Sequence, residues 1–178
     1  LNEAKAGLTG GPLPVRLYNY NTTMTAAAPK GWFNAAQPWR GASAYPLLYN
    51  SEENIFLRQL SVNSTVNRNC LFIKPAILAL FATTDHRRKM FLNRNVSNGT
   101  VTLPGFIRNS PTSVNLGPNL PNLLLMSAEC KARANDVAGA KADVEELRKN
   151  RMPAADATVK VTNQDDLVKF ILAERQKE

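Results

Sequence analysis

Apolar and polar residues follow a helical period most clearly between residues 123 and 151. In the second half of this stretch, apolar residues recur at steps of three and four residues, which places them on one helix face. They are Val137, Ala140, Val144 and Leu147. The pattern predicts a helical hairpin, in which one helix ends near Ala134, Asn135 and Asp136 form the turn, and a second helix runs to about Arg151.

Small residues recur on both helices of the predicted hairpin, at Ala128, Ala132 and Ala140. Small side chains let two helix backbones approach closely. A small residue midway along the first helix, a polar turn and an early alanine in the second are typical of a tetratricopeptide-type helix pair. Because one such pair cannot bury its apolar face alone, we expect neighbouring helices to cover it.

A further helical pattern begins after the predicted linker of residues 153–160. Thr162 to Asp165 offer a helix start, with acidic residues in the first turn. Leu167, Phe170 and Ile171 then make an apolar stripe. No glycine or proline stops the pattern, so we expect the helix to continue to the last residues.

The first 120 residues show weaker periodicity. Frequent glycine and proline make residues 1–50 rich in turns. Residues 15–20 alternate weakly, as in a short strand, and residues 54–60 read as a short buried strand or an extended segment. Pro75 suits a first helical turn, which predicts a helix near 75–84. Residues 101–103 are a further candidate strand. The chain is therefore predicted to be mainly α, with long irregular loops and a few short strands.

Five aromatic residues gather between residues 32 and 49: Trp32, Phe33, Trp39, Tyr45 and Tyr49. One interpretation is structural, because such rings fill a small core beneath a long loop. The other is functional, since sugars stack their apolar C–H faces on aromatic rings while nearby polar side chains bind hydroxyl groups. Trp32, Trp39 and Tyr45 are the candidate rings, with Asn34, Gln37 and Arg40 as polar partners. Composition alone favours the structural interpretation.

The net charge of +8 raises the question of a nucleic-acid partner. Residues 1–135 hold 14 Lys and Arg against 5 Asp and Glu, whereas residues 136–178 hold 8 against 9. The excess is spread thinly except at His86–Lys89, a run that would either meet phosphates or form a solvated helix end. The solvated helix end is the favoured interpretation.

The residues that carry chemistry are sparse. His86 is the single histidine and has no carboxylate spaced to orient it, so we expect it to be exposed. Asp85 and Arg87 are expected to pair or to cap the helix end. Cys70 and Cys130 lack a CxxC partner, which makes a zinc site improbable; two buried free thiols are favoured over a disulfide.

Known catalytic and phosphate-binding signatures are absent from the sequence. It contains no GxGxxG, GxxxxGK[ST], HExxH or GxSxG motif. We therefore expect no enzyme activity, no cofactor and no metal. No apolar run approaches the roughly 20 residues that span a bilayer.

Several segments resemble the SusD/RagB family of nutrient-binding outer-membrane lipoproteins of Bacteroidetes. Residues Leu123–Glu129 and Leu147–Arg151 are similar to the family's paired helices, and Ile171–Glu178 is similar to its Ile-Leu-x-Glu-Arg-x-x-Glu helix. Ser51–Phe56 and Asp85–Arg87 are looser matches. All occur in the family's order, but the family continues past the last match and begins with a lipoprotein signal. We therefore expect a partial chain.

The resemblance implies one partial SusD-like domain over residues 1–178, with a loop-rich, ligand-side segment over 1–120 and a helical-repeat scaffold, truncated at its C-terminus, over 121–178. It implies a non-enzymatic carbohydrate- or nutrient-binding protein on the cell surface. The expected partners are an oligosaccharide or peptide ligand and a SusC-like TonB-dependent transporter. Membrane attachment is expected only through a lipid anchor absent from this chain, and no nucleic-acid partner is expected.

Two other classes remain open. A helical-repeat adaptor would bind a protein segment in a groove lined by the hairpin rather than by the tryptophan loops. A basic nucleic-acid binder would show a steep dependence on salt.

Overall fold

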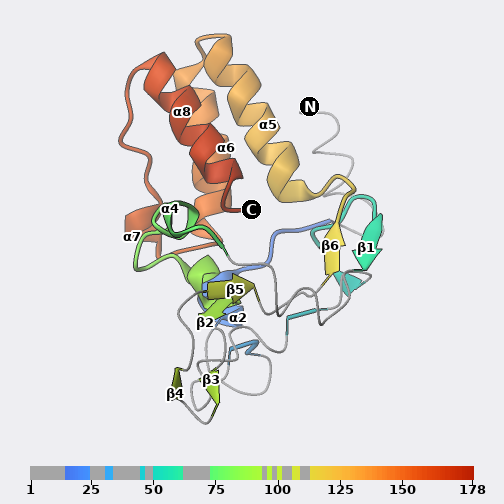
Figure 1. The fold of residues 1–178 in the computed structure, drawn as a ribbon. Coiled ribbons are helices and arrows are strands. Elements are labelled where there is room, and N and C mark those ends of the chain that lie inside the picture. Colours follow the sequence, from blue (N-terminus) through green and yellow to red (C-terminus); the bar gives the residue numbers. More distant parts are fainter. Residues whose placement is uncertain are drawn as a thin grey trace. The chain divides into compact units, whose positions relative to one another are not determined.

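A computed structural model describes the parts of the chain on which the following sections rest. These are residues 15–24, 31–33, 45–46, 50–61, 73–93, 96–97, 100–101, 106–108 and 113–178. Contacts divide them into two compact units (Figure 1). The helical unit comprises residues 15–19, 52–56 and 117–178, and the loop-rich unit comprises the described residues of 20–51 and 57–116.

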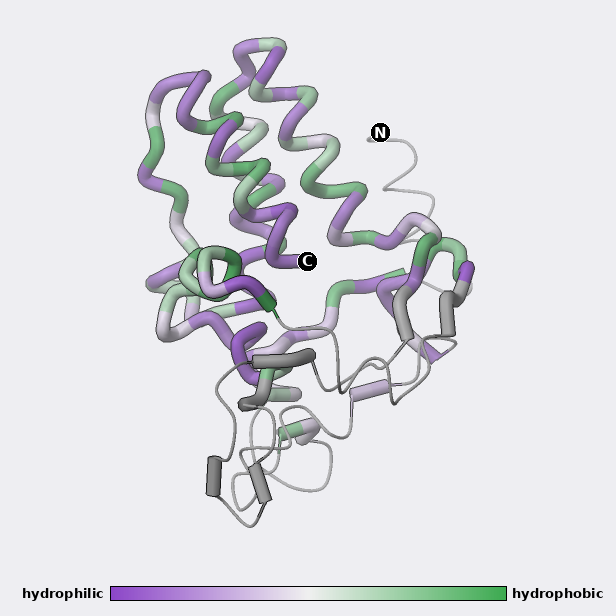
Figure 2. Tube along the Cα trace, in the orientation of Figure 1, coloured by the Kyte–Doolittle hydropathy of each residue, from purple (hydrophilic) through white to green (hydrophobic). Residues whose placement is uncertain are grey.

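Four helices form the helical unit: α5 Leu120–Arg133, α6 Val137–Lys149, α7 Ala154–Ala157 and α8 Gln164–Arg175. α5, α6 and α8 have 14, 13 and 12 residues, whereas no described strand exceeds three residues. The prediction of a mainly helical chain is confirmed. Apolar and polar residues alternate along these helices, as Figure 2 shows, so each offers one face to a core.

Side-chain caps fix where α5 and α6 begin. Asn119 caps α5 by accepting a hydrogen bond from the backbone N–H of Asn122 at 2.9 Å. Asp136 caps α6 in the same way, from the N–H of Gly139 at 2.8 Å. Between the helices, Asn135 has a φ of 63°, a left-handed conformation that asparagine tolerates in turns. The predicted hairpin, with its turn at Asn135 and Asp136, is confirmed.

The core of the helical unit lies where the small residues were expected. Ala128 and Ala132 of α5 and Ala140 of α6 are fully buried, as are Val144 and Leu147. Val137, at the start of the same stripe, is partly buried against them. Because alanine adds little bulk, the two backbones approach closely and the larger residues interlock around them.

α8 returns alongside α5. Asn163 caps it, and Leu167 and Ile171 are fully buried in the same core. The side chain of Gln164 at its start donates to the carbonyl of Arg133 at the end of α5, at 3.1 Å. α8 therefore begins where α5 ends and runs antiparallel to it.

Two expectations about this region are wrong. The predicted linker of residues 153–160 contains the one-turn helix α7, and Ala157 and Val159 are buried in the unit. α8 does not continue to the last residues but ends at Arg175, where Gln176 donates its N–H to the carbonyls of Leu172 and Glu174. The sequence pattern did not predict α7, because one helical turn is too short to show a periodic arrangement of apolar residues.

The thiol of Cys130 is exposed, which corrects the expectation of a buried cysteine within the hairpin. Cys130 lies two positions from both Ala128 and Ala132, which are buried. At 100° per residue, two positions turn a side chain to the opposite side of the helix. Cys70 lies outside the described residues.

The segment 52–56 attaches to the start of α5, across more than 60 positions of sequence. Asn54 forms an antiparallel bridge with Asn119, and Leu120 donates its N–H to the carbonyl of Glu53 at 2.8 Å. The N–H of Ile55 donates to the carbonyl of Pro118 at 3.1 Å. The helical unit thus draws on residues that the sequence assigned to the loop-rich front.

The loop-rich unit contains short elements. Its helices are α2 Tyr20–Thr23, α4 Pro75–Leu78 and the 3₁₀ helix η3 His86–Met90. Its strands are β1 Gln59–Ser61, β2 Phe91–Asn93, β3 Val96–Ser97, β4 Thr100–Val101, β5 Phe106–Arg108 and β6 Ser113–Asn115. They form three antiparallel pairs, β1 with β6, β2 with β5 and β3 with β4.

The structure moves several predicted boundaries in this front part. The weak alternation of residues 15–20 is not a strand, because residues 15–19 form no regular element and Tyr20 begins α2. The strand expected within 54–60 starts only at Gln59. Of the strand expected over 101–103, Val101 lies in β4 and the other two residues lie outside the described residues. The helix expected over 75–84 has Pro75 at its start, as predicted, but ends at Leu78.

Candidate functional site

Three aromatic rings of the loop-rich unit meet in one place, here called the aromatic cluster: Tyr20, Trp32 and Tyr45. The ring centroids of Trp32 and Tyr45 lie 4.8 Å apart, and Tyr20 lies 5.9 Å from Trp32 and 6.5 Å from Tyr45. Tyr20 meets both partners edge to face, at 72° and 84°, an arrangement that aromatic pairs favour. The hydroxyl oxygens of the two tyrosines are 3.2 Å apart, within hydrogen-bond distance.

The buried member of the cluster holds the others in place. Tyr20 is only 2% exposed, whereas Trp32 and Tyr45 are half-buried. The backbone N–H of Trp32 donates to the carbonyl of Thr23 at 2.6 Å, which fixes the loop against the end of α2. Two rings with remaining exposed surface therefore rest on a fixed aromatic base.

Lys89 of η3 contacts both the end of α2 and the segment that carries Trp32. Its ammonium group donates to the carbonyl of Met24 at 2.7 Å and lies 5.2 Å from the ring centroid of Phe33. Burial lowers the pKa of Lys89, since an ammonium group loses hydration there. Lys89 thus fastens the segment 31–33 to η3.

Asp85 and Arg87 form the pair that the sequence left open, but Asp85 caps the start of η3 rather than the end of the preceding helix. Arg87 Nη2 lies 2.6 Å from Asp85 Oδ2, and both side chains are buried. Asp85 Oδ1 also accepts from the backbone N–H of Arg87 at 3.0 Å, which caps η3. The guanidinium group of Arg87 lies 5.8 Å from the ring centroid of Phe81.

These contacts correct two expectations about the basic run His86–Lys89. It is not a solvated helix end, because Arg87 is buried and Lys89 is half-buried. His86 is also half-buried rather than exposed, and burial, followed by the charge of Lys89, lowers its pKa. Helix periodicity missed this because η3 is a 3₁₀ helix that starts after the expected helix end.

The structure brings together two of the six predicted ligand-binding residues, Trp32 and Tyr45. The other four, Asn34, Gln37, Trp39 and Arg40, lie outside the described residues. Tyr20, the buried base of the cluster, was missed because its stretch was interpreted as a strand. Nothing in the sequence separation of Tyr20 from Trp32 and Tyr45 predicts their contact, because that contact depends on how the loops fold.

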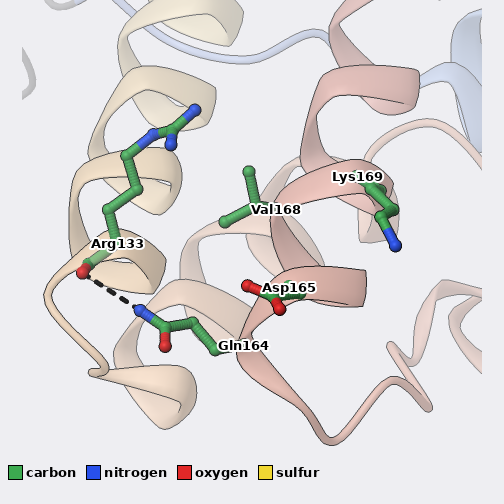
Figure 3. A pocket seen from close by; sticks show the side chains of 5 residues that line it. All are labelled: Arg133, Gln164, Asp165, Val168 and Lys169. Carbon is green, nitrogen blue, oxygen red and sulfur yellow. Dashed lines mark hydrogen bonds between the residues drawn. The ribbon is translucent and has the colours of Figure 1, made fainter.

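The helical unit carries a shallow depression of about 410 Å³ between the end of α5 and the start of α8 (Figure 3). Its lining residues are Arg133, Gln164, Asp165, Val168 and Lys169. Both cations already have partners, because Arg133 binds Glu129 at 2.8 Å and Lys169 binds Asp166 at 3.1 Å. Four of its five lining residues are charged or polar and it is open to solvent, unlike the enclosed, mainly apolar pockets that hold small molecules.

Two groups of features are missing from the described part of the chain. No group of three or more His, Cys, Asp or Glu side chains is placed to hold a metal ion there. Among its helices, none is both long enough and apolar enough to cross a membrane.

Comparison with known proteins adds no assignment. No family model and no curated protein matches the chain.

Proposed function

We propose that the chain belongs to a non-enzymatic surface-binding protein of the SusD/RagB kind. It would capture oligosaccharides or other nutrients at the outer face of the outer membrane and deliver them to a SusC-like TonB-dependent transporter. The α5–α6 pair would serve as a tetratricopeptide-like scaffold unit, and attachment to the membrane would be through a lipid anchor.

The aromatic cluster is the observation that carries the ligand-binding part of this proposal. Trp32 and Tyr45 keep exposed surface while the buried ring of Tyr20 holds them in position. A ring that is already ordered loses little conformational freedom when a ligand stacks on it. Aromatic surface of this kind suits the apolar C–H faces of a sugar.

The resemblance supports the scaffold part, because two of the similar segments meet in the helical unit. Residues 147–151 and 171–178 are joined by two ion pairs, Arg148 with Glu174 and Arg151 with Glu178, each at 3.0 Å. These four charged residues therefore hold the two segments together.

Titration calorimetry after a glycan-array screen tests the proposal with three matched variants. Trp32→Ala should weaken binding of a ligand found with the parent by about 10- to 100-fold, because buried interface tryptophans carry much of the binding energy. Tyr45→Phe keeps the ring and should change binding little. Phe56→Ala removes a ring that is 62% exposed and lies in the helical unit, so it should bind like the parent.

An unchanged affinity in Trp32→Ala, or an equal loss in Phe56→Ala, would contradict the aromatic site. The depression between α5 and α8 supports the second candidate, a helical-repeat adaptor for a protein segment. In that case the ligand would be a peptide, Arg133→Ala with Lys169→Ala would weaken its binding, and Trp32→Ala would not.

A further inference from the structure

Lys89 of η3 places a positive charge beside the aromatic cluster. Its ammonium group donates to the carbonyl of Met24 at 2.7 Å, and the backbone N–H of Trp32 donates to the carbonyl of Thr23 at 2.6 Å. The cation and the backbone of Trp32 are thus bound to consecutive carbonyl groups at the end of α2. Lys89 and the cluster therefore belong to one site within the loop-rich unit.

The second contact of Lys89 is with Phe33, the residue that follows Trp32. The nitrogen of the ammonium group lies 5.2 Å from the ring centroid of Phe33, a cation–π contact. The face of an aromatic ring attracts a cation but does not neutralise its charge. This contact therefore orients the ammonium group and leaves its full positive charge in place.

Within the described part of the chain, Lys89 pairs with no carboxylate. Its partners there are a carbonyl oxygen and an aromatic ring, both neutral. The acidic residue nearest to it in the sequence, Asp85, is bound by Arg87 at 2.6 Å. An ammonium group has three N–H donors, and the bond to Met24 uses one of them. Two donors and an uncompensated charge are therefore left for a ligand.

The surroundings of Lys89 favour an anionic partner. The side chain is half-buried, and burial lowers the pKa of Lys89 because the charged ammonium group loses hydration. An anion bound there restores part of the electrostatic stabilisation that the lost water supplied. Because less water screens the charge, the attraction is also stronger than at a fully hydrated lysine.

We propose that Lys89 determines the specificity of the aromatic cluster by binding an anionic group, a carboxylate or a sulfate, of the captured oligosaccharide. This inference rests on the function proposed above, in which Trp32 and Tyr45 stack on the sugar rings. Stacking is open to acidic and neutral sugars alike, whereas the ammonium group attracts only the acidic ones. The ligand class is therefore an acidic oligosaccharide.

The other basic residues of η3 do not offer the same site. Arg87 is buried in an ion pair. His86 is half-buried, and its pKa is lowered from 6.5 by burial and then by the charge of Lys89, so it is mostly uncharged at neutral pH. Arg88 is exposed, and its Nη1 lies 3.4 Å from the carbonyl of Phe81. Arg88 therefore provides a matched control, a cation at the adjacent position that binds a different part of the unit.

Titration calorimetry with paired glycans tests the role of Lys89. Trigalacturonic acid and its methyl ester test the carboxylate, and a κ-carrageenan tetrasaccharide and its desulfated form test the sulfate. Each pair shares one sugar backbone and differs in the charged group. The parent should bind the charged member of at least one pair about tenfold more tightly, as expected for one hydrogen bond between charged groups. The pair that shows this preference identifies the anion.

Four variants separate charge from stacking. Lys89→Met removes the charge but keeps an apolar contact with Phe33, since a methionine sulfur also packs on aromatic rings. It should bind both members of the pair with the affinity that the parent shows for the neutral one. Lys89→Arg keeps the charge and should keep the preference, and Arg88→Met should keep it as well. Trp32→Ala should weaken both members by the same factor.

The outcomes distinguish this inference from the proposed function. Equal affinity of the parent for both members of both pairs, or an unchanged preference in Lys89→Met, would overturn the role of Lys89. Loss of the preference in Arg88→Met as complete as in Lys89→Met would also overturn it, because net charge alone would then explain the binding. A parent that binds neutral glycans but none of these four would overturn the inference alone, and a parent that binds no glycan would overturn the proposed function with it. Should Lys89→Met fail to fold, the comparison of charged and neutral members in the parent and in Arg88→Met still decides.

Discussion

The two units of the chain are stabilised in different ways. In the helical unit, residues from a regular apolar stripe are fully buried on contiguous helices, as at Val144, Leu147 and Ile171. In the loop-rich unit, the buried residues are scattered and one buried ion pair, Asp85 with Arg87, stands among them. The helical unit also buries ion pairs, such as Arg151 with Glu53, so among the described residues the two units differ in the regular apolar packing, which spreads stability over many small contacts.

The largest effect should come from breaking the buried pair. Asp85→Ala leaves Arg87 buried without its carboxylate, which costs about 3–5 kcal/mol in comparable pairs. Hydrogen exchange should then lose protection around η3 and β2 while α5 and α6 stay protected. The double variant Asp85→Ala with Arg87→Met should recover part of the loss, because no unpaired charge is left.

A smaller but still large loss should follow from a cavity in the helical core. Leu147→Ala removes a fully buried side chain, and such changes cost about 2–5 kcal/mol. Urea unfolding gives the change in free energy, and hydrogen exchange should place it in α5, α6 and α8. If this variant and Asp85→Ala each removed protection from both units, the two units would form one cooperative structure and the comparison would be wrong.

The smallest effect should come from the cap of α6. A Cβ atom at Gly139 would collide with the carboxyl group of Asp136, so Gly139→Ala should lose the cap and cost about 0.5–2 kcal/mol. This reverses the usual gain when alanine replaces glycine in a helix. The change in melting temperature on thermal unfolding measures this loss of stability. In the Asp136→Ala background, Gly139→Ala should become stabilising, and a further loss there would contradict the role of the cap.

The sequence predicted the helical hairpin closely because its signals are local. The turn at Asn135 and Asp136, the buried stripe of α6 and the start of α8 all depend on residues within a few positions of one another. The sequence did not predict α7 and η3, which are too short to show a helical period. It also gave the wrong burial for Cys130, which lies on the helix face opposite to its buried neighbours Ala128 and Ala132. In the candidate site, Trp32 and Tyr45 were identified by composition, but Tyr20 was not.

The sequence by itself determined which segments become long helices and which face each one buries, because those features follow from periodicity and capping. Only the tertiary structure decided that residues 15–19 and 52–56 join the helical unit, that Tyr20 underlies Trp32 and Tyr45, and that Arg151 faces two buried carboxyl groups. Contacts such as these join residues up to 133 positions apart. No pattern within either segment encodes them, because the partner lies in another part of the chain and burial sets the charge state of each group.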